Sequence, residues 1–150
     1  MNYIIRLWSI VILICLLSAC SSAPIKVSIN SAEQLNQDQH NNPLPVQVKI
    51  YQLQDNNAFL QATFRELWLQ DAETLGNSML DKQEITINPS SETKIALARK
   101  KDCCYVGIVA IFLKPQGNNW RVINTINNRL SMIPLTIKVN LQSSKIMLSK

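Results

Sequence analysis

Apolar and polar residues alternate with a period of two along most of the chain, which is the pattern of strands with one buried face. The clearest alternating runs are 25–30, 46–53 and 135–141. Two further strands are predicted at 83–88 and 93–98. The turn-forming residues that separate these two strands predict that they form a hairpin.

One segment, 104–113, is apolar on both faces, which is typical of a central strand covered on both sides. Strands are also predicted at 120–125 and 146–148, the last of them joined to the preceding strand by Ser143 and Ser144. About eight short strands, with turns at the spacing usual in sandwiches, predict an all-β fold, namely a two-sheet β-sandwich.

One helix is predicted to interrupt the strand pattern after the second strand. Leu60, Phe64, Leu67 and Trp68 recur at helical spacing and form an apolar stripe. We interpret Phe59, Phe64 and Trp68 as packing this helix onto a sheet, and a role in stacking on a ligand is the alternative.

A long polar segment, 31–45, separates the first two strands. It is rich in Asn and Gln and ends in two prolines, which predicts a surface loop rather than a tight hairpin. Loops of this length often carry function. His40, the only histidine, lies in this loop and could make binding depend on pH, although a solvated loop residue is the preferred interpretation.

The amino terminus is typical of a signal peptide. A short stretch with one positive charge precedes the apolar run 7–17, which is about 11 residues long, within the range of a secretory signal and short for a membrane-spanning helix. The run ends in Leu17-Ser18-Ala19-Cys20, which resembles the lipobox of bacterial lipoproteins. An ordinary secretory signal cut after Ala19, with an unmodified Cys20, is the alternative.

The lipobox resemblance implies that residues 1–19 are removed and that Cys20 carries the lipid. Residues 20–24 would then form a lipidated tether, followed by the β-sandwich domain at 25–150. Ser21 rather than Asp follows the cysteine, which in lipoproteins of this kind permits export to the outer membrane.

Composition excludes several classes of function. The chain has 150 residues, 47% of them hydrophobic, which suits one folded domain. The net charge of +5 falls to +4 when Arg6 leaves with the signal, and the dispersed basic residues argue against nucleic acid as a partner. One His and three Gly leave little for a metal site, a phosphate-binding loop or a His-dependent triad. We therefore expect no enzyme, no metal, no cofactor and no small-molecule substrate.

The processed chain keeps two cysteines, Cys103 and Cys104, which are neighbours. Adjacent Cα atoms lie about 3.8 Å apart, below the roughly 4.4–6.8 Å of ordinary disulfides. We interpret both as small buried hydrophobes; a vicinal disulfide and a reactive or intermolecular thiol are the alternatives.

The cluster Arg99-Lys100-Lys101 is interpreted as a solvated turn, with contact to anionic lipid or an acidic partner as the alternative.

Several short sequences, taken in order, resemble the SciN (TssJ) family, the outer-membrane lipoproteins of the type VI secretion system. They span nearly the whole processed chain. They are Leu35-Asn36, Pro45-Val46-Gln47-Val48-Lys49-Ile50-Tyr51-Gln52-Leu53, Phe59, Phe64 with Leu67-Trp68, Leu75-Gly76, Ile87-Asn88-Pro89, Tyr105-Val106-Gly107-Ile108-Val109-Ala110-Ile111-Phe112 and Trp120-Arg121.

The resemblance implies a transthyretin-like β-sandwich tethered to the outer membrane and facing the periplasm. It would bind the periplasmic part of TssM, the IcmF-like inner-membrane protein, and the family's contact surface includes the loop between the first two strands. That loop contributes Leu35, Asn36, Gln37, Asp38, Gln39, His40, Asn41, Asn42, Pro43 and Leu44. The Cys103-Cys104 pair departs from the family's pattern and leaves the packing there open.

A carrier or pilot lipoprotein, which binds a small ligand or another secretion channel, is the alternative function. It would need a deep apolar pocket in the sandwich. The assembly role instead predicts a filled core and a protruding first loop.

Overall fold

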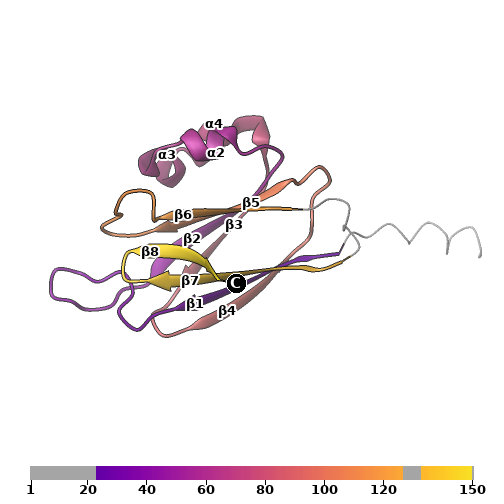
Figure 1. Ribbon diagram of the computed structural model, residues 1–150. Coiled ribbons are helices and arrows are strands. Elements are labelled where there is room, and N and C mark those ends of the chain that lie inside the picture. Colours follow the sequence, from indigo (N-terminus) through magenta and orange to yellow (C-terminus); the bar gives the residue numbers. More distant parts are fainter. Residues whose placement is uncertain (1–22, 127–132, 150) are drawn as a thin grey trace, which may run out of the picture.

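The computed structural model describes residues 23–126 and 133–149 (Figure 1). In this part of the chain, eight strands form two four-stranded sheets that pack face to face, and short helices cover the outer face of one sheet. The signal segment and Cys20 lie outside the described residues. No helix among the described residues is long and apolar enough to span a membrane.

The first sheet has the strand order β4-β1-β7-β8. It consists of β1 (Ile25–Ser31), β4 (Glu92–Leu97), β7 (Leu135–Gln142) and β8 (Lys145–Ser149). β1 pairs antiparallel with β4 and parallel with β7. The alternation of β1 and β7 buries every second residue against the other sheet, as the pattern predicts.

The second sheet has the order β3-β2-β5-β6. It consists of β3 (Met79–Ile87), β2 (Val46–Leu53), β5 (Tyr105–Ile111) and β6 (Arg121–Thr125). β2 and β5 are its central strands and are buried on both faces, because one face packs on the first sheet and the other lies under the helices. The prediction of a central strand at 104–113 is confirmed.

The predicted single helix is wrong, because the segment forms separate short helices. They are α2 (Asn57–Gln61), α3 (Phe64–Leu69) and α4 (Asp71–Leu75), followed by the 3₁₀ turn η1 (Gly76–Ser78). A capping box begins α3 anew: the Thr63 hydroxyl accepts from the Glu66 amide, and the Glu66 carboxylate accepts from the Thr63 amide.

The break changes which side chains face the sheet. Phe59 and Leu67 are fully buried and Phe64 is half-buried. Leu60 and Trp68 are 46% and 45% exposed, so they do not belong to the packed face predicted for one continuous helix. The packing interpretation therefore holds for Phe59 and Phe64 but fails for Trp68.

The predicted hairpin between 83–88 and 93–98 is also wrong, because β3 and β4 belong to different sheets. The chain crosses between the layers at residues 88–91. Ser31 holds this crossing, since its hydroxyl donates to the carbonyl of Asn88 (2.7 Å) and accepts from the amide of Ser91 (2.8 Å). By contrast, the final hairpin is confirmed, with Gln142 paired to Lys145 across two turn residues.

The two remaining cysteines lie just before β5. Cys103 is buried and Cys104 is half-buried, and neither forms a disulfide in the described part of the chain. The Cys103 thiol donates to the Tyr105 carbonyl and the Cys104 thiol to the Asp102 carbonyl, each at 3.5 Å. Burial raises the pKa of the Cys103 thiol. The buried-hydrophobe interpretation therefore describes Cys103 well and Cys104 only in part.

Candidate partner-binding surface

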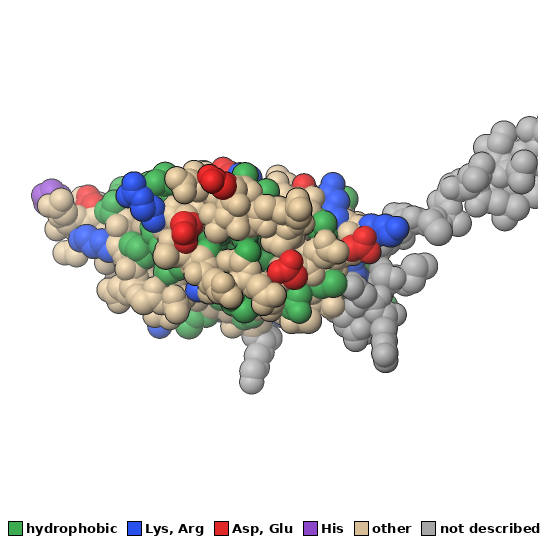
Figure 2. Space-filling model, turned by 90° about the horizontal axis from the view of Figure 1, so that it is seen from above, with side chains coloured by type: hydrophobic (Ala, Val, Ile, Leu, Met, Phe, Trp, Pro, Cys, Tyr) green, Lys and Arg blue, Asp and Glu red, His purple; other side chains and the backbone are tan. Residues whose placement is uncertain are grey.

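The loop between β1 and β2 projects from one end of the sandwich. Because β1 runs through the first sheet from its start at Ile25 to the loop, the loop lies at the opposite end of the sheet from the beginning of β1 (Figure 1). The space-filling view shows the same projection at one end of the molecule (Figure 2). The structure thus has the protruding first loop that the sequence predicts.

The base of the loop is fixed by two residues that point inward. Leu35 is fully buried in the core. Asn36 is buried as well; its Nδ2 donates to the Pro45 carbonyl (2.9 Å), and its Oδ1 accepts from the Leu113 amide (2.7 Å). Asn36 has a φ of 49°, a left-handed conformation that asparagine tolerates. These two expected contact residues therefore support the loop from inside rather than offering their side chains to a partner.

Asp38 organises the tip of the loop. Its Oδ1 accepts from the amides of His40 (2.7 Å) and Asn42 (2.9 Å), and its Oδ2 accepts from the Asn42 side chain (3.0 Å). The bond from the Asn42 side chain is the main reason that the pKa of Asp38 lies below its ordinary value. The tip is therefore a preformed turn of the Asx kind.

The remaining expected contact residues are accessible. The side chain of His40 is 83% exposed, and its Nδ1 lies 4.0 Å from Asp38 Oδ2. Gln37, Asp38 and Leu44 are half-buried, whereas residues 39–43 are exposed. The loop therefore presents a polar, ordered tip of about five residues on a buried base.

An apolar groove lies beside the base of the loop. Phe64 and Trp68 of α3 form one side of it, and Ile111, Phe112 and Leu113 form the other, with Asn36 at the loop end. Leu113 is 57% exposed. Because Asn36 lies both at the base of the loop and at the end of the groove, the groove adjoins the base of the loop.

Lys49 holds the helical layer, formed by α2, α3 and α4, on the second sheet beside this groove. It lies on the outer face of β2, and its Nζ donates to the carbonyls of Leu67 (3.2 Å) and Trp68 (2.8 Å). The same Nζ lies 3.1 Å from the carboxylate of Asp71. A buried ammonium group therefore satisfies the end of α3 and the start of α4 at once.

Asp71 is the centre of this buried charged cluster. Its carboxylate accepts from the Tyr51 hydroxyl (2.9 Å) and from Lys82 (3.1 Å) as well as from Lys49. Burial alone would raise the pKa of Asp71, but these hydrogen bonds outweigh it and hold the pKa below its ordinary value. Burial, and then the bond to Asp71, raises the pKa of Tyr51, so the phenol stays protonated.

Arg121 fastens the other end of the layer. Its guanidinium donates to the carbonyls of Phe59 (2.6 Å), Leu60 (2.7 Å) and Ala62 (2.8 Å), and it stacks 4.6 Å from the centre of the Trp120 ring. Burial lowers the pKa of Arg121. The planar guanidinium thus satisfies the last carbonyls of α2.

Residues 23–144 match the family model described as "Type VI secretion lipoprotein, VasD, EvfM, TssJ, VC_A0113". The chain belongs to this family. The match covers the whole sandwich up to the turn before β8. A comparison with curated proteins gives no match.

Solved structures share the fold of this type VI secretion lipoprotein. The lipoprotein TssJ1 from Pseudomonas aeruginosa is 19% identical with a TM-score of 0.77, covering 85% of this chain and 95% of the other. Lip from Serratia marcescens, described as a membrane-bound component of the type VI secretion system, is 20% identical with a TM-score of 0.79. The match covers 85% of this chain and 98% of Lip. A chain of the structure described as the TssM C-terminal domain (869–1107) from EAEC is 21% identical with a TM-score of 0.73. The match covers 85% of this chain and 98% of the other.

The hydrophobic pattern of this type VI secretion lipoprotein does not reveal which charged residues hold its fold together. Lys49, Asp71 and Arg121 each fit a solvated position in the pattern, yet they hold the helices on the second sheet. The one available signal was the Thr63–Glu66 spacing of a capping box, which marks the start of α3. In the described residues, no group of His, Cys, Asp and Glu is arranged to hold a metal ion.

Proposed function

We propose that this chain is an assembly lipoprotein of the type VI secretion membrane complex. A lipid on Cys20 would hold it in the outer membrane, facing the periplasm, and the loop between β1 and β2 would bind the periplasmic domain of TssM. Membership of the family supports this role. The observation that carries the binding site is the ordered, exposed loop tip on its buried base.

The arrangement of the two attachment points supports the proposal. The tether would enter the domain at Ile25, and the loop leaves the same strand after Ser31. A strand of seven residues spans about 23 Å, so the binding loop lies about that far along the sandwich from the tether. An anchored domain raises the local concentration of its binding loop near a partner, so a small interface is sufficient.

The preformed tip supports binding without a large ordering cost. Because the Asp38 hydrogen bonds already fix the turn, a partner would not have to order it. The groove beside the loop, with Trp68 and Leu113 exposed, offers apolar area next to this polar tip. Partly exposed aromatic side chains of this kind are common energetic centres of protein interfaces.

The interior supports the assembly role over a carrier. Side chains from the inner faces of both sheets, among them Ile29, Val48, Ile50 and Ile108, are fully buried against one another. A carrier of a small apolar ligand would need a deep apolar pocket at this place.

The full chain and its Cys20→Ser variant test the anchor and the partner together. Wild-type protein in detergent-solubilised envelopes should carry an acylated Cys20 and co-purify with TssM. Cys20→Ser should leave the membrane fraction without a change in thermal unfolding. Membrane retention of that variant, or isolation of wild type without TssM, would count against the proposal.

A further inference from the structure

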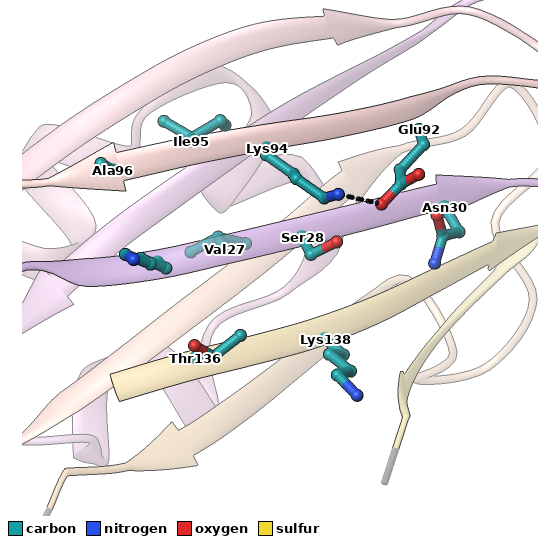
Figure 3. Close-up of a pocket in the computed structure, with 10 residues that line it drawn as sticks. Val27, Ser28, Asn30, Glu92, Lys94, Ile95, Ala96, Thr136 and Lys138 are labelled. Atoms are coloured by element: carbon teal, nitrogen blue, oxygen red, sulfur yellow. Dashed lines mark ion pairs between the residues drawn. The ribbon is translucent and has the colours of Figure 1, made fainter. Parts of the chain in front are cut away.

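The outer face of the first sheet carries a hollow lined by basic residues. It lies over β1, β4 and β7, has a volume of about 690 Å³, and is on the side of the sandwich away from the described helices (Figures 1 and 3). Lys26, Lys94 and Lys138 line it, and Glu92 is the acidic residue of the lining. The lining side chains therefore carry a net charge of +2.

Strand register brings these groups together. Ser28 of β1 lies between Lys94 of β4 and Lys138 of β7, and Thr136 lies beside Lys26. The short side chains of Ser28, Ala96 and Thr136 leave the middle of the face open, and Lys94 and Lys138 come from the strands on either side of Ser28 (Figure 3). A hollow lined by lysines and by the hydroxyl residues Ser28 and Thr136 suits an anion with several oxygen atoms, such as a phosphate group.

Glu92 does not neutralise the hollow. Its carboxylate lies 2.8 Å from Lys94 Nζ, and the side chain of Lys94 is 73% exposed (Figure 3). An exposed pair of this kind is weak, so an anion can compete for Lys94 at little cost.

The hollow begins close to the proposed anchor. Lys26 follows Cys20 by six residues, which span about 21 Å at most. We propose, resting on the lipid anchor of the proposed function, that this hollow binds the phosphate groups of anionic phospholipids in the same bilayer. The domain then rests on the membrane through the outer face of its first sheet.

This orientation leaves the other candidate surface accessible. The helical layer lies on the opposite side of the sandwich. The loop between β1 and β2 projects from one end of the sandwich (Figure 1). The lipid keeps the domain at the membrane, and each basic residue near an anionic surface shifts the orientation equilibrium by about fivefold.

Lysine labelling on the anchored protein tests this orientation. The full processed chain is reconstituted in phosphatidylcholine vesicles with and without phosphatidylglycerol, and acetylation of each lysine is measured by mass spectrometry. Lys26, Lys94 and Lys138 should react about fivefold more slowly in the anionic vesicles. Lys114, which lies near the loop end, should react equally in both. About 1 M salt should remove the difference, because the Debye length then falls to about 3 Å.

Two variants with the same net charge complete the test. Lys94→Gln/Lys138→Gln should abolish the protection of Lys26. The control Arg65→Gln/Lys114→Gln, in which Arg65 is exposed on α3, should keep it. The protein could float with both vesicle types and yet show equal lysine labelling in both. That result would overturn the membrane-facing hollow but leave the lipid anchor intact. Protection that appears only when the TssM periplasmic domain is added would overturn it too, in favour of a protein contact. Protein that floats with neither vesicle would overturn the anchor, and with it this inference.

Discussion

The ring of Phe59 occupies the space that a side chain at position 107 would need. A Cβ atom on Gly107 would lie 2.6 Å from Cε2 of Phe59. Gly107 lies on the outer face of β5, opposite Tyr51 of β2, and the Phe59 and Tyr51 rings meet edge to face at 6.1 Å. The missing side chain on β5 therefore lets α2 lie directly on the second sheet.

Replacing this glycine should destabilise the domain. Gly107→Ala should lower the free energy of unfolding in urea by about 1–3 kcal/mol, because the fully buried ring has to move. In a Phe59→Leu background, Gly107→Ala should lower the free energy of unfolding by less, because the ring that clashes with the new methyl group is absent. Strictly additive effects of the two substitutions would show that the ring and the glycine are not coupled.

Acid should weaken the cluster around Asp71. The folded state holds the pKa of Asp71 below its unfolded value of about 3.9, so the unfolded chain binds the proton first as the pH falls. The stabilisation is complete above the unfolded pKa and is lost as the pH falls through the folded pKa.

Asp71→Asn should therefore lower the free energy of unfolding by about 3 kcal/mol at neutral pH, where it deprives Lys49 of its nearest carboxylate, and by less in acid. Urea denaturation at about pH 7 and about pH 3 measures the difference from wild type. The exposed Glu73→Gln on the same helix should stay close to wild type at neutral pH. A penalty for Asp71→Asn that is independent of pH would contradict this role.

Arg121 should be irreplaceable by lysine. The planar guanidinium reaches three carbonyls around the end of α2, and a lysine ammonium cannot match that geometry. Arg121→Lys should speed hydrogen exchange of the α2 amides by about tenfold, the loss of roughly one to two hydrogen bonds. Exchange in α4, which Lys49 and Asp71 hold, should change much less. Unchanged protection of α2 would mean that apolar packing alone fixes it.

The base and the tip of the loop should differ in their effects on stability. Asn36→Ala removes two part-buried hydrogen bonds and leaves the Leu113 amide without its acceptor, so it should lower the free energy of unfolding by about 1–3 kcal/mol. His40→Ala changes an exposed side chain and should stay within about 0.5 kcal/mol of wild type. Thermal unfolding of both variants measures this contrast, which would vanish if the loop were not held by Asn36.

Strand patterning predicts the sandwich well because burial follows the alternation directly. β1 and β7 each place one face in the core, and β5 is covered on both sides, as their sequences indicate. The same alternation does not determine which strands pair with each other. The turn residues at 88–91 fit a hairpin and a crossing between sheets equally well, and the deciding contact comes from Ser31, some sixty residues away.

The candidate surface was predictable only in part for a similar reason. Composition predicts an exposed loop, and the tip residues do lie exposed. The inward direction of Asn36 depends on carbonyl and amide partners at Pro45 and Leu113, which no local pattern reveals. A stripe along one continuous helix predicts that Trp68 packs on the sheet. The capping box at Thr63 instead starts a new helix, and Trp68 lies in the wall of the groove.

The binding affinity of the loop tip for the TssM periplasmic domain tests the central claim most directly. Isothermal titration would compare wild type with Gln39→Ala/His40→Ala, which alters exposed tip residues, and with Gln61→Ala/Glu73→Ala, an exposed pair on α2 and α4. We expect the tip variant to bind about tenfold more weakly with an unchanged unfolding temperature, and the control to bind like wild type. Equal affinity of tip variant and wild type would contradict the assignment of this loop as the partner-binding site.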